Sequence, residues 1–588
     1  MLKTNTDNVV AAIKRVRLWY VALFVIFGLF GVRLFYLQVI RHNHYKAAAL
    51  SGQLKQYEVP ARRGMIYAKE GDVTVPIVLN QKLYTLYADP GYIKDADKAA
   101  AQVAQAVGGQ ASDYLPLIKA EDTRYSVLKK RLTETQKNKI AKLQQPGLGT
   151  VEQDYRTYPQ GTLAAQLLGF VNEDGQGKYG LEQALNEELT GVPGELKAVT
   201  DSRGVPLAAN SDNIERAPVN GKGIVLTVDV AMQQQLEAIL KKGVENAKSE
   251  GGSALIMDAN TGAIKAMANY PTYDPSNFGS VQDGSVFNNA AVSEPLEVGS
   301  VMKPLTAAAA LNQGVVSANT CYYDPAKYKV DEFTITNIEE DGPAGNRCIK
   351  DILNLSLNTG ATWLLMQMGD GQLNSKGRTA WHSYMTEHYL FGQTTGIEQG
   401  YEATGYVPDA EDNGAGINLT YANTTFGQAM TATPLQLGAA LAAVVNGGTY
   451  YQPHLVAAKI DASGKQIEQK PIIKKTDVVS AQVSQQIISM MQYTVDNHSF
   501  SKKFDQSRYS VGGKTGTAQI AKPNGGYYED EFNGTYVGFV GGDKPQYVIV
   551  VKISKAKNGG YAGTAAAQPV FGNLAHMLLN NFNVTPRN

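Results

Sequence analysis

The first strong pattern in the chain is an unbroken apolar run near its N-terminus. Residues 18–40 read LWYVALFVIFGLFGVRLFYLQVI, and Arg33 carries the only charge among them. As a helix, this run has about the length needed to cross the hydrocarbon core of a bilayer. Trp19 and Tyr36 suit the two interfaces, and Arg33 is near enough to one end to reach the headgroups. The pattern therefore predicts a transmembrane anchor over residues 18–40.

A cleaved signal peptide is the alternative explanation of this run, with residues 47–49, all alanine, as the small-residue cleavage site. The anchor is favoured because the run is long and because Arg41, His42, His44 and Lys46 separate it from these alanines.

Basic residues before the run set the expected orientation. Lys3, Lys14, Arg15 and Arg17 all precede it. The positive-inside rule places residues 1–17 in the cytoplasm as a short tail and exports the chain from about residue 41 onward. The folded domains are therefore expected outside the membrane.

The chain from residue 41 to residue 218 has the pattern of a mostly-β domain. Apolar and polar residues alternate around Gly64 and Gly71, as in short strands and turns. Helical periodicity predicts helices over residues 95–107 and 134–143, and strands and turns return from about residue 150. Because no reactive constellation is found in this region, we expect a non-catalytic, elongated domain that ends in the turn-forming residues 217–223.

A second exported domain is predicted over residues 219–588. It opens with a strand and an amphipathic helix over residues 224–247, followed by a hairpin whose turn is residues 258–262. Alanine-rich helices dominate to about residue 446. From Tyr509 three strand-like runs return, and a helix over residues 569–579 closes the chain. An antiparallel sheet built from strands distant in sequence, with helices around it, is the expected α+β or α/β fold.

Composition narrows the function without deciding it. The 588 residues include 54 Lys and Arg and 54 Asp and Glu, and no basic tract favours nucleic acid as a partner. No Cys/His cluster has zinc spacing, so neither a metal nor another cofactor is expected. Cys321 and Cys348 are the only cysteines, and in an exported domain they are able to form a disulfide. Two free structural thiols stay open as the alternative.

Three short motifs bring reactive groups into the second domain. Ser300 and Lys303 lie three residues apart at a predicted helix start, so their side chains share one face and the lysine amine can activate the serine hydroxyl. Ser356 and Asn358 follow in a helix-flanked stretch. Residues 514–517, Lys-Thr-Gly-Thr, lie on a predicted strand where a cation and a hydroxyl can receive a carboxylate. Each motif alone is common, since a serine before a helix is usually only a cap.

Taken together and in this order, the three motifs resemble those of the penicillin-recognising serine acyltransferases. Within that superfamily the chain is similar to a class B, monofunctional penicillin-binding protein: a peptidoglycan D,D-transpeptidase with one anchor, a pedestal or dimerisation-type domain and a β-lactamase-like transpeptidase domain. The resemblance covers nearly the whole chain. Shorter supporting matches are Arg63-Gly64-Met65-Ile66, Tyr158-Pro159-Gln160-Gly161, Leu168-Gly169-Phe170-Val171, Tyr179-Gly180-Leu181-Glu182, Leu226-Thr227-Val228-Asp229, Phe426-Gly427-Gln428 and Thr433-Pro434-Leu435-Gln436.

The resemblance implies a role for each motif residue. Ser300 is the acylated nucleophile, Lys303 its general base, and Ser356 relays a proton toward the leaving D-alanine. Asn358 positions Lys303 and the donor peptide. Lys514 is implied in catalysis and, with Thr515, Gly516 and Thr517, in binding the substrate carboxylate. The backbone N–H groups of Ser300 and Thr517 form the oxyanion hole.

The sequence departs from the family pattern at two places, and one segment matches nothing. Val298 stands where the family usually has proline, and residues 68–70, Ala-Lys-Glu, replace a commoner Asp-Arg pair. Neither departure touches an implied catalytic group. The acidic segment from Cys321 to Cys348 has no counterpart that we recognise, and its role is left open.

Three other functions fit the same motifs. A serine β-lactamase or a D,D-carboxypeptidase of the same superfamily would hydrolyse the acyl-enzyme, and a non-enzymatic β-lactam sensor or scaffold would bind without turnover. One class of lactamase uses a glutamate in Glu-x-x-Leu-Asn, a string that occurs at residues 182–186. Because this string precedes Ser300 and lies in the pedestal match, we interpret it as coincidental.

The implied partners are peptidoglycan stem peptides, β-lactams and the bacterial inner membrane. No segment resembles the family's glycosyltransferase domain, so the resemblance implies a polytopic membrane glycan polymerase as partner. Gly28 and Gly31 in the anchor are suited to close helix packing against it. Glu297, just before the nucleophile, is typical of division-type members and slightly favours a septal role over a side-wall role.

Overall fold

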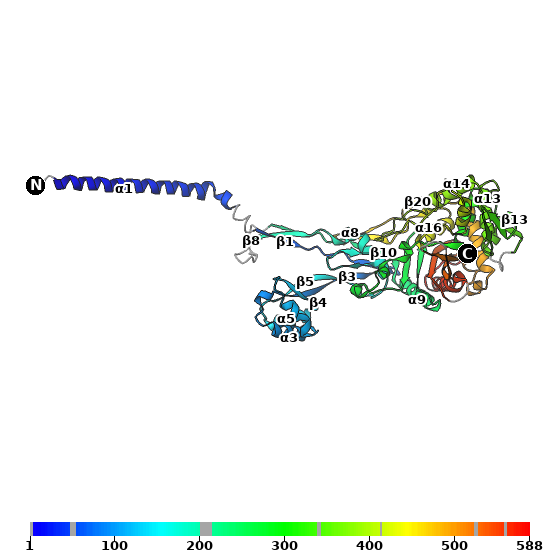
Figure 1. Ribbon diagram of the computed structural model, residues 1–588, viewed down its shortest axis with the longest axis horizontal. Helices are drawn as coiled ribbons and strands as arrows, with labels where there is room; N and C mark the ends of the chain where they lie inside the picture. Colours follow the sequence, from blue (N-terminus) through cyan, green and yellow to red (C-terminus); the bar gives the residue numbers. More distant parts are fainter. Residues whose placement is uncertain are drawn as a thin grey trace. The chain divides into compact units, whose positions relative to one another are not determined.

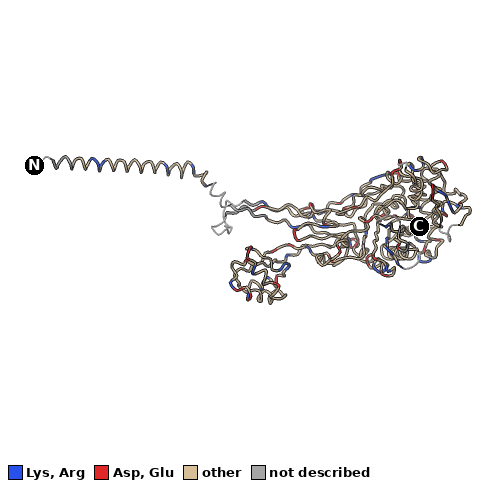
Figure 2. The backbone as a smooth tube through the Cα atoms, in the orientation of Figure 1, with Lys and Arg blue, Asp and Glu red and all other residues tan. Residues whose placement is uncertain are grey.

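The structure is a computed structural model that describes residues 4–46, 54–199, 214–337, 343–411, 414–522, 527–557 and 561–587. The chain folds as two compact units. The first comprises Met1–Ala61 and Gly191–Asn220, and the second comprises Arg62–Thr190 and Gly221–Asn588. Basic and acidic residues are both spread over the second unit, whereas the long N-terminal helix carries mainly basic ones (Figure 2).

The first unit contains the predicted anchor. Helix α1 (Thr4–Phe35) continues into a π-helical turn, η1 (Tyr36–Ile40), and is a single long helix (Figure 1). Its stretch Val10–Ile40 is long and apolar enough to cross a membrane, with a mean hydropathy of 2.1 and no burial against the rest of the chain. Large side chains such as Trp19 and Phe24 are more than two-thirds exposed, so an apolar surrounding must cover them. The helix is compatible with single-pass anchoring.

The rest of the first unit is a three-stranded antiparallel sheet in the order β1-β8-β9. Its strands are β1 (Leu54–Val59), β8 (Gly194–Val199) and β9 (Ile214–Arg216). Residues 47–49, considered above as a cleavage site, lie outside the described residues.

In the second unit, one mixed sheet combines strands from both sides of residue 218. Its order is β19-β18-β10-β2-β3-β4, and β5 pairs with β3. Strand β10 runs parallel to β2, with Ile224 opposite Ile66, and antiparallel to β18. The domain boundary placed at residue 218 stays a prediction. The strands are β2 (Ile66–Glu70), β3 (Val73–Ala88), β4 (Ser126–Leu132), β5 (Leu148–Thr157), β10 (Gly223–Asp229), β18 (Val456–Ile460) and β19 (Gln466–Glu468).

Three helices pack beside β3 and β4 on a small apolar core. They are α3 (Ala96–Val107), α4 (Ala111–Ile118) and α5 (Glu134–Leu143). The two predicted helices are confirmed; each begins after a side-chain cap, Asp95 for α3 and Thr133 for α5. Helix α4 was not predicted, because it is short and contains Pro116, which sequence patterns count against a helix.

The second sheet is antiparallel and has the order β12-β11-β23-β22-β21. Its strands are β11 (Gly251–Asp258), β12 (Ile264–Tyr270), β21 (Ser510–Ala521), β22 (Tyr527–Gly541) and β23 (Pro545–Ser554). The pairing of β11 with β23 joins residues about three hundred positions apart, such as Gly251 and Ser554. This confirms the predicted sheet of sequence-distant strands and the predicted hairpin that opens it.

Helices cover both faces of this sheet because side chains alternate along its central strands. Leu255 and the opposite Val550 enter one core with α11 (Lys303–Asn312), α16 (Pro434–Val445) and α17 (Ala481–Asp496). Ile256 and the opposite Ile549 enter another with α9 (Val230–Asn246) and α18 (Gln568–Asn581). The predicted antiparallel sheet with helices around it is confirmed.

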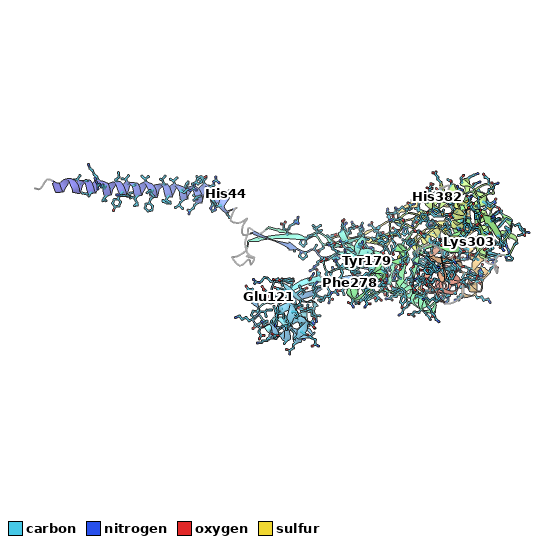
Figure 3. The ribbon with its side chains drawn as sticks, viewed as in Figure 1. His44, Glu121, Tyr179, Phe278, Lys303 and His382 are labelled. Atoms are coloured by element: carbon cyan, nitrogen blue, oxygen red, sulfur yellow. A yellow bond between two sulfur atoms is a disulfide. The ribbon has the colours of Figure 1, made fainter. Side chains whose placement is uncertain are left out.

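An aromatic cluster packs the loop after β12 against a short hairpin, β6 (Phe170–Val171) and β7 (Gly177–Lys178). Phe170 stacks on Phe278 with ring centroids 4.2 Å apart, and its ring centroid lies 5.8 Å from that of Tyr179. Figure 3 labels Phe278 and Tyr179 of this cluster.

Other helices and strands of the second unit are α6 (Ala165–Leu168), α7 (Gly180–Ala184), α8 (Asn186–Thr190), α10 (Ala290–Ser293), α12 (Ile349–Asn354), α13 (Asn358–Met368), α14 (Ser375–Ser383), α15 (Ile417–Thr424), β17 (Tyr450–Tyr451), β20 (Ile473–Lys475), and the short helices η2 (Pro90–Tyr92), η3 (Pro275–Ser280), η4 (Gly284–Phe287), η6 (Tyr384–His388) and η7 (Ser499–Lys503).

A fully buried carboxylate joins three segments beside the mixed sheet. Glu182 in α7 accepts from Arg63 Nε at 2.7 Å and from Arg156 Nε at 2.8 Å. Its side chain has no exposed surface, and those of the two arginines are 10% and 4% exposed. Arg63 also donates to Asn186 and Thr190. Glu182 is therefore the counter-charge of two buried cations.

Replacing Glu182 with glutamine should lower the stability of the second unit by about 3 kcal/mol, because two buried guanidinium groups would lose their counter-charge. Urea unfolding of the soluble region measures the change. Glu152→Gln is the matched control, since Glu152 pairs with Lys82 at 2.6 Å but both side chains are about half exposed. The urea midpoint of Glu152→Gln should equal that of the wild type. Equal midpoints for Glu182→Gln and Glu152→Gln would contradict the structural role of Glu182.

Candidate active site

The first motif lies where a tight turn enters α11. Gly299–Met302 form a 3₁₀ turn, η5, and Lys303 begins the α-helix, with Pro304 in its first turn. This places Lys303 Nζ 2.9 Å from Ser300 Oγ. Lys303 is completely buried. Burial, and next the charge of Lys514, hold the pKa of the Lys303 amine well below its usual range.

The second motif surrounds the same amine from the other side. Lys303 Nζ donates to Ser356 O at 2.5 Å, to Ser356 Oγ at 3.1 Å and to Asn358 Oδ1 at 2.8 Å. Ser356 has a φ of +55°, a left-handed conformation that turns the chain sharply between α12 and α13. Four oxygen atoms of three residues thus converge on one buried nitrogen.

The third motif lies along β21, whose glycine allows close approach of the Ser300 turn. A Cβ added at Gly516 would lie 2.3 Å from Thr535 Oγ1 and 2.8 Å from Val298 O. Thr535 Oγ1 itself donates to Val298 O at 3.1 Å. Because these atoms already fill the space, a side chain at Gly516 would push the turn away from the strand.

Lys514 and the two threonines flank this glycine on the strand. Lys514 is 3% exposed, and its amine donates to Thr515 O at 3.1 Å and to Thr515 Oγ1 at 3.3 Å. Thr517 Oγ1 accepts from Gly563 N at 3.0 Å, which joins the strand to the turn η8 (Gly563–Ala567). The Thr515 and Thr517 side chains face the cavity described next, whereas Gly516 lies against the Ser300 turn.

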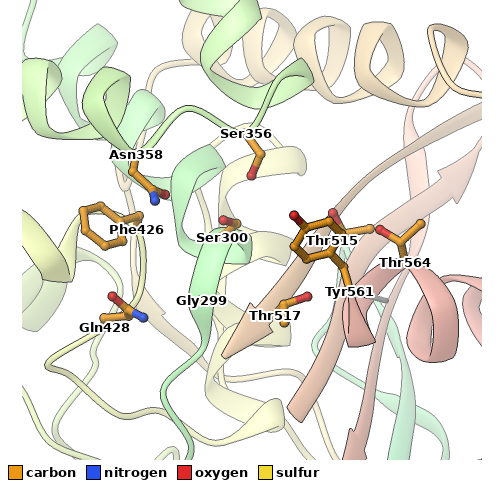
Figure 4. Close-up of a pocket in the computed structure, with 10 residues that line it drawn as sticks. All are labelled: Gly299, Ser300, Ser356, Asn358, Phe426, Gln428, Thr515, Thr517, Tyr561 and Thr564. Carbon is orange, nitrogen blue, oxygen red and sulfur yellow. The ribbon is translucent and has the colours of Figure 1, made fainter. Parts of the chain in front are cut away.

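A cavity of about 160 Å³ opens at Ser300 Oγ. Figure 4 shows Ser356 and Asn358 near the serine, with Thr515 and Thr517 on the strand side. The cavity is lined by Gly299, Ser300, Ser356, Asn358, Phe426, Gln428, Thr515, Thr517, Tyr561 and Thr564. The structure thus brings the three predicted motifs to one place.

Five lining residues, Gly299 among them, received no role from the sequence. Phe426 and Gln428 were noted only as part of a family match, and Gly427 O between them accepts from Gly299 N at 2.9 Å. Tyr561 and Thr564 were missed; Tyr561 lies in the loop before η8 and Thr564 in η8 itself, where no periodicity marks a functional residue. Among the described residues, no group of three or more His, Cys, Asp or Glu side chains is arranged to hold a metal ion.

Several predicted positions lie outside the cavity lining, and among them are Lys303, Lys514 and Gly516 of the motifs themselves. Glu182, the glutamate of the lactamase-like string, is held by Arg63 and Arg156 as described above. Cys321 and Cys348 are joined by a disulfide at the base of a hairpin, and no free cysteine is present.

Comparison with known proteins identifies the family. A model of the penicillin binding protein transpeptidase domain matches residues 252–576, and a model of the penicillin-binding protein dimerisation domain matches residues 58–226. The chain belongs to the penicillin-binding protein transpeptidase family. This confirms the class B penicillin-binding protein recognised from the motifs.

Relatives of the whole chain agree with this assignment. The chain is 30% identical over 581 residues to stage V sporulation protein D of Bacillus subtilis, covering 97% of this chain and 87% of that protein. It is 27% identical to the peptidoglycan D,D-transpeptidase FtsI of Escherichia coli K12, over 94% and 89% of the two chains. The fold is similar to penicillin-binding protein 2X of Streptococcus thermophilus, with a TM-score of 0.70, 23% identity, and coverage of 89% and 79%.

Proposed function

We propose that this penicillin-binding protein cross-links peptidoglycan by serine acyl transfer and is a target of β-lactams. The observation that carries the proposal is the 2.9 Å contact between Ser300 Oγ and the buried Lys303 amine. A lysine amine acts as a base only when it is neutral, and burial with a nearby cation favours the neutral form. Transpeptidase relatives over almost the full length of the chain support the same activity.

In the proposed acylation, Ser300 Oγ attacks the carbonyl carbon of the D-alanyl-D-alanine bond of a stem peptide as Lys303 accepts the hydroxyl proton. Ser356, within hydrogen-bonding distance of Lys303, passes a proton to the leaving amine, and free D-alanine departs as the C–N bond breaks. The amine of a second stem peptide then attacks the acyl ester, releases Ser300 and completes the cross-link. In a β-lactam, the ring amide opens at the same step and the leaving amine stays attached.

The other residues are proposed to bind the donor peptide. Lys514 and Thr515 receive its terminal carboxylate, and Asn358 orients both Lys303 and the donor. Gly516 keeps the strand clear for the substrate backbone. The N–H groups of Ser300 and Thr517 stabilise the developing oxyanion, each donor contributing about 3 kcal/mol.

Intact mass of the purified exported region after incubation with benzylpenicillin tests the proposal. The wild type should gain one penicilloyl mass that persists for hours, and Ser300→Ala should gain none. A wild type that forms no adduct and leaves the antibiotic intact would favour the non-enzymatic scaffold. Rapid destruction of the antibiotic would favour a β-lactamase instead.

The proposed base also predicts how acylation depends on pH. Because Lys303 acts as the neutral amine, the acylation rate should rise with pH through its lowered pKa and stay constant above it. Lys514 contributes to the lowering, so Lys514→Gln should move this rise to higher pH, besides slowing acylation at every pH. Lys459→Gln, which removes an ammonium paired with Glu188, is the control and should leave the rise in place. An unshifted or opposite profile for Lys514→Gln would contradict the assignment of the base.

The same proposal extends to the membrane. The basic residues before the apolar helix favour a cytoplasmic N-terminus in the bacterial inner membrane, with both family-matched domains on the outer side. A polytopic glycan polymerase is the proposed partner of the anchor. Gly28 and Gly31 leave open space on the helix, since a Cβ added at either meets no atom within 4 Å.

Replacing Gly28 and Gly31 together with leucine should lower the recovery of such a polymerase in copurification from detergent-solubilised membranes, because the larger side chains prevent close helix packing. The matched control is Ala22→Leu, which adds the same side chain on another side of the helix. Unchanged recovery for the double glycine variant would count against this contact.

A further inference from the structure

The segment between Cys321 and Cys348, to which the sequence assigned no role, adjoins the active site. Its described strands form two antiparallel pairs: β13 (Cys321–Asp324) pairs with β16 (Gly345–Cys348), and between them β14 (Lys327–Val330) and β15 (Phe333–Thr336) form a hairpin. The disulfide joins the first pair of the β13–β16 ladder, and Asp324 opposite Gly345 forms the last pair. We call the segment from Cys321 to Cys348 the disulfide hairpin.

The disulfide hairpin fixes the amide of Asn358. Asn358 Nδ2 donates to Thr336 O, at the end of β15, at 3.1 Å. A backbone carbonyl can only accept, so the NH₂ group of the amide must face Thr336. The amide oxygen must then point the other way, where it lies 2.8 Å from Lys303 Nζ.

A second set of bonds holds Thr336 in register with α13. The hydroxyl oxygen of Thr359, the residue after Asn358, lies 2.8 Å from each carboxylate oxygen of Asp324, and its one proton can be donated to that carboxylate. Its N–H donates to Asn337 Oδ1 at 3.0 Å, and Asn337 directly follows Thr336. Asp324 and Thr359 are almost fully buried, with 1% and 0% of their surfaces exposed. Hydrogen bonds to a buried carboxylate are strong, so they resist displacement of the hairpin.

We propose that Asp324 is a positioning residue for catalysis: through Thr359 and Asn337 it holds the Thr336 carbonyl where it orients Asn358 toward Lys303. The disulfide hairpin is then a support of the second motif. This inference rests on the proposed function. If Asp324 is replaced by asparagine, one acceptor oxygen is exchanged for an NH₂ group that faces another donor, so the Thr359 contacts weaken and Asn358 loses its fixed orientation.

The test compares the rate of acylation by benzylpenicillin in four proteins: wild type, Asp324→Asn, Asn358→Ala and the double variant. Asp324→Asn should slow acylation about 10-fold, the effect of losing one hydrogen bond to a charged group. In the Asn358→Ala background, the same change should have no further effect, since the orientation it maintains is already lost. The matched control is Asp331→Asn in the same hairpin, whose exposed carboxylate accepts from Leu419 N and not from α13, and which should acylate as the wild type does.

Each alternative has its own result. Acylation of Asp324→Asn at the wild-type rate would overturn the positioning role and leave the proposed function intact. Equal slowing in both backgrounds would show that Asp324 acts on general stability and not through Asn358, and would also overturn it. A wild type that forms no adduct would overturn the proposed function, and this inference with it. Thr359→Val, which removes the hydroxyl without changing the shape of the side chain, provides a second variant if Asp324→Asn does not fold.

Discussion

The active site depends on keeping one amine, the side-chain nitrogen of Lys303, out of water. A fully buried lysine is costly when charged, and the four oxygen atoms around this nitrogen are hydroxyl, carbonyl and amide oxygens, none of them a carboxylate. A carboxylate at this place would stabilise the ammonium form and remove the proposed base. The neutral amine has two N–H groups, which the oxygens of Ser356 and Asn358 can accept, and its lone pair is then left for the Ser300 hydroxyl proton. The second motif therefore serves the chemistry of the first even before substrate binds.

The approach of the Ser300 turn to β21 is the second constraint. Gly299 has a φ of +66°, and a Cβ on it would lie 2.9 Å from Thr517 O. From the strand, a Cβ on Gly516 would lie 2.8 Å from Val298 O, next to the same turn. The 3₁₀ turn and the strand therefore lie closer together than two residues with side chains would allow. This holds Ser300 beside the strand that would bind the substrate carboxylate. Helices α11 and α16 pack with the sheet in one apolar core, and this packing supports the turn and the strand.

Much of this could be predicted from the sequence, because the motifs are local and the elements that carry them have clear periodicity. The hairpin at 258–262, the late strands and the closing helix all follow from alternation and turn residues. What the sequence did not reveal depends on tertiary contacts. Helix α4 is stabilised by packing despite Pro116, and Tyr561 reaches the cavity from a loop. The role of Asp324 depends on a buried hydroxyl thirty-five positions further along the chain, which no local pattern can indicate.

The balance between transfer and hydrolysis depends on which groups can activate a water at the acyl ester. The described residues that line the cavity offer hydroxyl groups, two amides and two aromatic rings, but no carboxylate. Glu182, the glutamate whose sequence context suggests a lactamase base, is fully buried and paired with two arginines. It does not line the cavity, and its charge is already neutralised. Lys303 is the base proposed for acylation, and it lies 2.9 Å from Ser300 Oγ without itself lining the cavity. Because the lining supplies no carboxylate to activate a water molecule, hydrolysis lacks the base that the lactamase string would provide, and this favours an amine acceptor as the second nucleophile.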